Sequence, residues 1–322
     1  MTGRAELFRA LGALAEPPEP GHTAIAAALD LGVAARPGDY AEVFLFSAYP
    51  YASVYLGAEG MLGGEARDRV AGFWRALGLT PPSEPDHVAA LLGLYASLID
   101  LEVKAGRDGD AARTLLRRES RTALLFEHLL SWLPLYVEVV IDQAPPFYAR
   151  WATLLRDALA TETRELGIPD RLPLHLRAAP ELPSADAPAG DWISALLAPV
   201  RSGVIITRPD LARAAASLGI GARAGERAYI LRSLLEQDAR GTAGWLAGEA
   251  RRAATGHRSR LPTLGPIAAF WTARAEGTTA ALELDAVASP AAGPVLKPTA
   301  LGGTSEEPAG EPVAIPTSAS GS

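Results

Sequence analysis

The amino-acid sequence predicts an all-α protein on three observations. Apolar residues recur at three- and four-residue steps in several windows, which places them along one face of a helix. Proline and small oxygen-bearing residues precede several of these windows and glycine follows, as is typical of helix ends. No stretch combines alternating apolar and polar residues with the Asn-Gly or Asp-Gly turns of a β-sheet.

Length and composition limit the class of protein. A chain of 322 residues, 48% of them hydrophobic, can bury one or two cores without covalent crosslinks. It contains no cysteine, which excludes disulfides, thiolate-bound zinc, iron–sulfur clusters and cysteine nucleophiles. The net charge of −7 disfavours a nucleic-acid partner held through its phosphates, so a basic peptide is the better match.

The sequence shows no export signal and no membrane span. The first 15 residues contain no twin-arginine pair, no long apolar core and no small-residue cleavage site. The most apolar stretch, residues 132–141, includes Glu138 and is about half the roughly 20 residues that a membrane helix needs. We therefore expect a soluble, cytoplasmic protein.

The first domain is expected to span residues 1–165. Its clearest helix begins at Val88, where apolar residues follow at helical spacing: Leu91, Leu92, Tyr95, Leu98 and Ile99. Ser83, Pro85 and Asp86 precede this helix, and we expect an oxygen-bearing side chain among them to cap its free N–H groups.

Two further helices are expected before residue 167. Residues 126–142 have helical spacing, but Pro134 lacks a backbone donor and crowds the preceding turn, so we expect a break or kink there. The next helix begins at Pro145 and Pro146 and ends near Gly167.

The remainder of the chain is expected to form three parts. Five prolines in residues 166–190 indicate a linker or irregular segment. Residues 191–283 form a C-terminal helical region, in which Thr207, Pro209 and Asp210 begin one helix and Gly219 ends it. The last part is residues 284–322, whose proline, alanine, glycine and serine predict a disordered tail.

No pattern indicates a catalytic, metal or cofactor site. No two of the five histidines lie three or four residues apart: His22, His87, His128, His175 and His257. The glycine-rich stretches 60–64 and 219–225 lack the Lys-Ser or Lys-Thr of a phosphate loop and are interpreted as turns and helix ends. Two basic clusters are interpreted as solvated helix faces: Arg113, Arg117, Arg118 and Arg121, and Arg251, Arg252, Arg258 and Arg260. By elimination, the chain is expected to bind a partner and not to be an enzyme.

The segment Ser83-Glu84-Pro85-Asp86-His87 resembles the Glu-x-Pro-Asp-His signature of TorD-like chaperones, which serve molybdenum enzymes of the DMSO reductase class. Other segments are similar to the family in the same order, namely 49–56, 60–64, 73–74, 78–79, 128–134 and 146–148. Together the similar segments lie within residues 40–163.

The resemblance implies a TorD-like helical bundle, here with an additional C-terminal helical region, that acts as a chaperone without cofactor or metal of its own. Its partner would be the catalytic subunit of a molybdenum oxidoreductase or the twin-arginine signal peptide of that subunit. Binding would let cofactor insertion finish before export or assembly. The client-binding candidates are Glu84, Pro85, Asp86, His87, Tyr95 and Trp132.

Structural roles for these residues stay open. Asp86 serves equally well as a helix cap and His87 as the partner of a nearby carbonyl, while Trp132 beside a helix break fits a core position. Two other functions also stay open: a helical protein that binds or hydrolyses guanine nucleotide, and a helical adaptor with an unrelated client. The identity of the client, the role of residues 191–283 and the choice between monomer and homodimer are not determined by the sequence.

Overall fold

The described part of the chain is built from helices alone. The computed structural model describes residues 3–288, which contain 17 α-helices, two π-helical segments and no strand, so the all-α prediction is confirmed. Tyr51 and His87 form an isolated antiparallel bridge. The first elements are α1 (Gly3–Ala13), α2 (His22–Ala28), α3 (Pro37–Tyr40), η1 (Ala41–Ser47), α4 (Ala52–Leu56), α5 (Gly64–Ala76), α6 (Val88–Arg107), α7 (Ala111–Ala123), η2 (Leu124–Leu129), α8 (Leu133–Gln143) and α9 (Pro146–Leu166).

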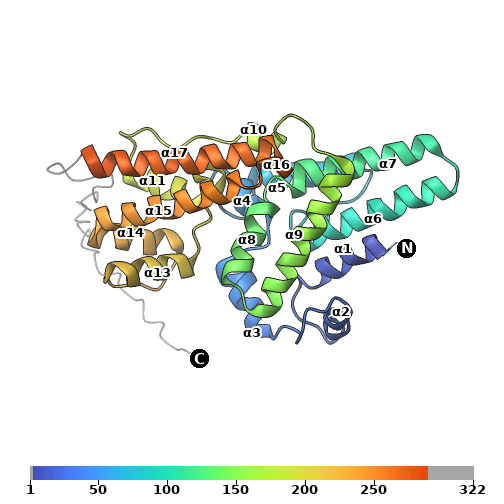
Figure 1. The fold of residues 1–322 in the computed structure, drawn as a ribbon, viewed down its shortest axis with the longest axis horizontal. Coiled ribbons are helices and arrows are strands. Elements are labelled where there is room, and N and C mark those ends of the chain that lie inside the picture. The colour runs from blue at the N-terminus through green and yellow to red at the C-terminus, as the bar shows by residue number, and fades with distance from the viewer. Residues whose placement is uncertain (1–2, 289–322) are drawn as a thin grey trace, which may run out of the picture.

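These elements form an N-terminal bundle, in which α1 packs on α6, α6 on α7 and α8 on α9 (Figure 1). Aromatic side chains fill its core. Trp132 stacks on Tyr55 with ring centroids 5.2 Å apart, and the indole N–H of Trp151 donates to the carbonyl of Leu11 at 2.9 Å. Full burial of one such side chain contributes about 1.5–3 kcal/mol, so these rings fasten α1, α4 and α9 to the bundle.

The predicted break at Pro134 is present. The π-helical η2 ends at Leu129, and α8 begins at Leu133 with Pro134 in its first turn, where a missing N–H costs nothing. Residues 111–129 and 133–143 meet at a bend of 56°. The predicted helix from Pro146 to Gly167 is also present as α9.

No single helix in residues 3–288 is long and apolar enough to cross a membrane. The bent pair made of α7 with η2 and of α8 passes this test by length and composition when both parts are taken together. Most side chains from Leu124 to Val137 are buried in the N-terminal core, which accounts for their apolar character.

The interpretation of the first basic cluster as a solvated face is wrong for Arg121. This side chain is fully buried, and it forms ion pairs with Glu102 of α6 and with Glu162 and Glu165 of α9 at 2.9–3.0 Å. Arg113 and Arg118 are exposed, as expected. Helical spacing placed all four arginines on one helix, but the packing of α7 against α6 determines which of them faces inward.

Residues 166–190 carry one short helix, α10 (Leu174–Arg177), in otherwise irregular backbone. This segment is fastened to the N-terminal bundle. The backbone N–H of Leu174 donates to Glu127 Oε2 at 2.7 Å, and His175 Nε2 lies 3.4 Å from His128 Nδ1. Both imidazoles are buried, so the segment contributes to the N-terminal core.

These two histidines predict a pH dependence of stability. Burial lowers the pKa of His128 to about 4 and that of His175 to about 3. Below pH 6.5 the unfolded chain therefore binds protons that the folded chain does not, and stability falls as the pH drops toward 4. In urea denaturation at a series of pH values, the double variant His128→Leu/His175→Leu should reduce this slope by up to about 1.4 kcal/mol per pH unit for each histidine. Equal slopes for parent and variant would contradict the assignment.

A second apolar core lies in the C-terminal region. The helices of this region are α11 (Ala189–Leu197), α12 (Pro199–Ser202), α13 (Arg208–Leu218), α14 (Arg227–Gln237), α15 (Ala239–Arg258), α16 (Leu261–Leu264) and α17 (Pro266–Ala288). Helices α11, α13, α14, α15 and α17 form the second core, whereas Val200 of α12 and Leu264 of α16 pack in the N-terminal core. Helix α13 begins and ends as predicted. The Thr207 hydroxyl accepts from the N–H of Asp210 at 3.2 Å, Asp210 Oδ2 accepts from the N–H of Thr207 at 2.7 Å, and Gly219 has a φ of 68°.

Helix α17 joins the two cores. Ile267, Ala268 and Trp271 lie in the N-terminal core, whereas Ala275 and Leu282 lie in the second core. Figure 1 shows α17 running from α16 along α15. Because its apolar residues are not confined to one face, helical periodicity did not single it out.

One boundary needs correction. The disordered tail was predicted to begin at residue 284, but residues 284–288 continue α17. The rest of the predicted tail, residues 289–322, lies outside the described residues.

Candidate functional site

The loop that carries the signature connects α5 to α6. Its Asp86 caps α4 and not α6, the helix that the sequence predicted. Asp86 is 2% exposed. Its carboxylate Oδ2 accepts from the backbone N–H of Ser53 at 3.0 Å, and its carbonyl accepts from Ala52 at 3.0 Å. The prediction that a residue from Ser83, Pro85 or Asp86 caps α6 is therefore wrong: Asp86 caps α4, which begins 34 residues earlier.

His87 is the residue that caps α6. Its Nδ1 accepts from the N–H of Ala89 at 3.2 Å, and its ring meets the Tyr51 ring edge-on with centroids 4.8 Å apart. Burial lowers the pKa of His87, against the opposing pull of the carboxylates of Glu16, Glu84 and Asp86. The neutral ring, with Nδ1 unprotonated, is the form that completes the cap.

Glu84 and Pro85, the other two candidate residues of the loop, differ in exposure to solvent. Pro85 is buried, and its carbonyl accepts from the Trp74 indole N–H at 3.4 Å. Glu84 is exposed and hydrogen-bonds the hydroxyl of Tyr51, whose pKa is raised by burial and by this carboxylate. The loop thus presents one carboxylate to solvent while its other side chains hold the backbone.

A surface hollow of about 470 Å³ opens beside this loop, between α1 and the start of α6. Its lining includes Glu16, Pro82, Glu84 and His87. The Arg9 guanidinium at its edge is engaged with Glu6 and Asp100. The Glu16 and Glu84 carboxylates therefore leave the hollow acidic.

Two of the six candidate residues do not reach any surface. Tyr95 and Trp132 are both fully buried. The hydroxyl of Tyr95 donates to Glu162 Oε2 at 2.6 Å, and the indole of Trp132 donates to the carbonyl of His128 at 2.9 Å. In this structure their contacts are those of core residues. Of the six candidates, Glu84 and His87 line the hollow.

Sequence patterns missed two residues that complete the site. Glu16 precedes α2 without any motif, and it faces His87 with its Oε1 3.6 Å from the ring Nδ1. Ser53 lies in a segment noted for its similarity, but nothing local indicated that its N–H meets Asp86. Across residues 3–288, no group of three or more metal-ligating side chains gathers in one place.

Asp86→Ala tests the capping role. The change removes the acceptor of the Ser53 N–H and should lower the free energy of unfolding by about 1–2 kcal/mol, whereas Asp86→Asn keeps an acceptor and should lower it less. Urea denaturation followed by circular dichroism measures both. An unchanged stability together with lost partner binding would instead make Asp86 a contact residue.

Comparison with known protein families supports the resemblance. Residues 15–138 match the sequence model of the family described as nitrate reductase delta subunit. This match contains the signature loop, the upstream segments and the segment 128–134, and it ends before residues 146–148. A comparison with curated proteins found no match.

Proposed function

Because residues 15–138 match the sequence model of the nitrate reductase delta subunit family, we propose that this chain is a chaperone of the NarJ and TorD type that matures a molybdenum oxidoreductase subunit. Members of this family partner with molybdoenzyme subunits in general. The chain would bind the signal peptide or the body of its client in the cytoplasm. Export or assembly would then wait until the cofactor has been inserted.

The observation that carries the proposal is the acidic hollow beside the signature loop. Glu16 and Glu84 stand at its rim, and the first turn of α6 forms one wall. A signal peptide begins with basic residues, which these carboxylates would attract and orient. The small residues Gly12, Ala89 and Ala90 leave room for a chain to lie along α1 and α6.

The hydrogen bonds of the loop also fit binding better than catalysis. The Asp86 carboxylate accepts from Ser53, and His87 Nδ1 accepts from Ala89. A general base needs a free lone pair within reach of its substrate. His87 uses its unprotonated Nδ1 to hold α6, and the Asp86 carboxylate, which holds α4 through Oδ2, is 2% exposed and does not line the hollow, so neither is placed to act as a base on a substrate there.

Client maturation is tested by co-production. Each molybdenum oxidoreductase catalytic subunit encoded in the same genome would be produced with and without this chain, and the molybdenum content of the purified subunit would be measured by mass spectrometry. We expect one subunit to lose most of its molybdenum when the chain is absent. Equal molybdenum content for every subunit, with and without the chain, would overturn the proposal.

The hollow is tested with the leader peptide of that subunit. Glu16→Gln/Glu84→Gln should weaken binding of the labelled peptide by about fivefold or more in fluorescence anisotropy, since each partly exposed ion pair is worth up to about 1 kcal/mol. Glu119→Gln, which removes an exposed carboxylate on α7, is the matched control and should leave the affinity unchanged. Equal affinities for all three proteins would rule out the hollow as the contact surface.

A further inference from the structure

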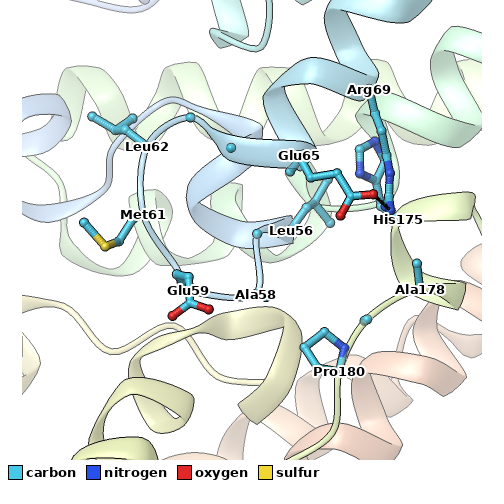
Figure 2. A pocket seen from close by; sticks show the side chains of 15 residues that line it. Leu56, Ala58, Glu59, Met61, Leu62, Glu65, Arg69, His175, Ala178 and Pro180 are labelled. Atoms are coloured by element: carbon cyan, nitrogen blue, oxygen red, sulfur yellow. Dashed lines mark hydrogen bonds and ion pairs between the residues drawn. The ribbon is translucent and has the colours of Figure 1, made fainter.

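A second depression lies between the loop 57–64, the first turn of α5 and residues 175–180. Figure 2 shows this groove of about 390 Å³. Apolar and small side chains form most of its lining, among them Leu56, Ala178 and Pro180. Met61 and Leu62 at its edge are 70% and 59% exposed, so two adjacent large apolar side chains face solvent beside the groove.

The conformation of this loop is held from both sides. Gly60 has a φ of 61°, and a Cβ at this position would lie 2.9 Å from the Cα of Ala198 at the start of α12. The N–H of Gly63 donates to Ser53 Oγ at 3.1 Å. The C-terminal region and α4 therefore fix the backbone that presents Met61 and Leu62 to solvent.

Several polar groups that line the groove have no ion-pair or hydrogen-bond partner among the described residues. Glu59 is exposed and has no ion pair or hydrogen bond within the described chain, whereas Glu65 is paired with Arg69. In the part of the chain that the structure describes, no side chain caps α5, whose first residues line the groove. His175 is 2% exposed and lies beside Arg69 in Figure 2, and its buried Nδ1 has no hydrogen-bond partner among residues 3–288.

We propose that this groove binds an extended apolar segment of the client that carries one basic side chain. The apolar side chains would cover Met61 and Leu62, the basic group would pair with Glu59, and a backbone carbonyl would accept from the first N–H groups of α5. This inference rests on the proposed function, because it takes the occupant to be a client polypeptide.

The two surfaces are connected by hydrogen bonds. Asp86 holds the start of α4 through Ser53 N–H, and Ser53 Oγ holds Gly63 in the groove loop. Asp86 is therefore a positioning residue for the groove: it is buried, but its loss displaces Ser53 and with it the backbone around Met61. The signature loop would thus affect the client at two places, directly through Glu84 and indirectly through Asp86.

The groove is tested with two fluorescein-labelled ten-residue peptides of leucine and alanine, one with a central arginine and one with glutamate at that position. Anisotropy titrations of the full chain should show tighter binding of the arginine peptide by about fivefold. Glu59→Lys should reverse this preference, and Met61→Ser/Leu62→Ser should weaken both peptides by about tenfold or more. The matched controls on α7, Leu115→Ser/Leu116→Ser and Glu119→Lys, remove equally exposed groups and should change neither affinity.

Hydrogen exchange tests the positioning role. Exchange at the Gly63 amide should accelerate several-fold in Ser53→Ala and in Asp86→Ala, and by more than exchange at the core amides of α9, which follows only the loss of global stability. Ser97→Ala, whose hydroxyl bonds within its own helix, should leave Gly63 unaffected. Unaltered exchange at Gly63 in Asp86→Ala would overturn the connection.

The outcomes separate this inference from the proposed function. Failure of the parent chain to bind either peptide, or equal binding by the groove variants and the parent, would overturn the groove. A client that still needs the chain for its molybdenum, while the groove variants mature it fully, would retain the proposed function without the groove. Peptide binding in the groove without any molybdenum dependence would overturn the proposed function instead.

Discussion

Arg121→Met should lower the free energy of unfolding by about 3–5 kcal/mol, the usual cost of breaking a buried ion pair by removing one partner. The guanidinium of Arg121 is fully enclosed and contacts Glu102, Glu162 and Glu165. Glu162 is 1% exposed and also accepts from the Tyr95 hydroxyl. Without Arg121, the Glu102 and Glu162 carboxylates, which are 14% and 1% exposed, would lose this cation, whereas the 37% exposed Glu165 would stay paired with Arg4.

Urea denaturation with two probes measures this loss. Arg113→Met is the matched control, because Arg113 lies on the same helix, is 61% exposed and pairs with Asp110, so its loss should cost less than about 1 kcal/mol. Adding Glu162→Gln to Arg121→Met should recover part of the stability, since it removes the most buried of the stranded charges. A cost near that of Arg113→Met would contradict the role assigned to this network.

Trp271→Ala should cost about 3–5 kcal/mol and should also uncouple the two cores. Trp271 is 1% exposed, lies in the N-terminal core although it belongs to α17, and donates its indole N–H to the Ser131 carbonyl at 3.2 Å. We propose residues 1–165 with the segment 166–190 as one cooperative unit and residues 191–283 as a second, joined by α17. Removing this anchor should separate their unfolding transitions.

Calorimetry of the parent and the variant tests the division into two units. The parent should unfold in one transition and Trp271→Ala in two, with the earlier transition assigned by hydrogen exchange of residues 208–258. Trp245→Ala is the control, because Trp245 packs at the edge of the second core and does not touch the first. A single transition in Trp271→Ala would mean that contacts other than α17 hold the cores together.

The helices that the sequence predicted best are those whose signals are local. Pro146 and Gly167 lie at the ends of α9, and Thr207 with Asp210 and Gly219 lie at the ends of α13, as predicted. In each case the backbone preference of proline or glycine, or a side chain that caps its own helix, acts within four residues. Helix α17 has apolar residues on all sides, so no such signal separated its faces.

The candidate site was predicted less completely. The signature loop was identified from its resemblance, and the match of residues 15–138 supports that identification. The contacts of its residues were not predicted, because Asp86 meets Ser53 and His87 faces Glu16, and these partners come from distant parts of the chain. Tyr95 and Trp132 have helical spacing that suits either a groove or a core, and burial decides for the core.

The sequence by itself determined the all-α class, the positions of several helix ends and the resemblance of residues 15–138 to the nitrate reductase delta subunit family, since these depend on spacing and on the residue types within short segments. The tertiary structure alone decided that Arg121 is buried, that Asp86 caps α4 and that Met61 and Leu62 stand at the edge of a groove. The physical reason is that burial and hydrogen-bond partners across 30 or more residues depend on how the helices pack, which local backbone preferences do not specify.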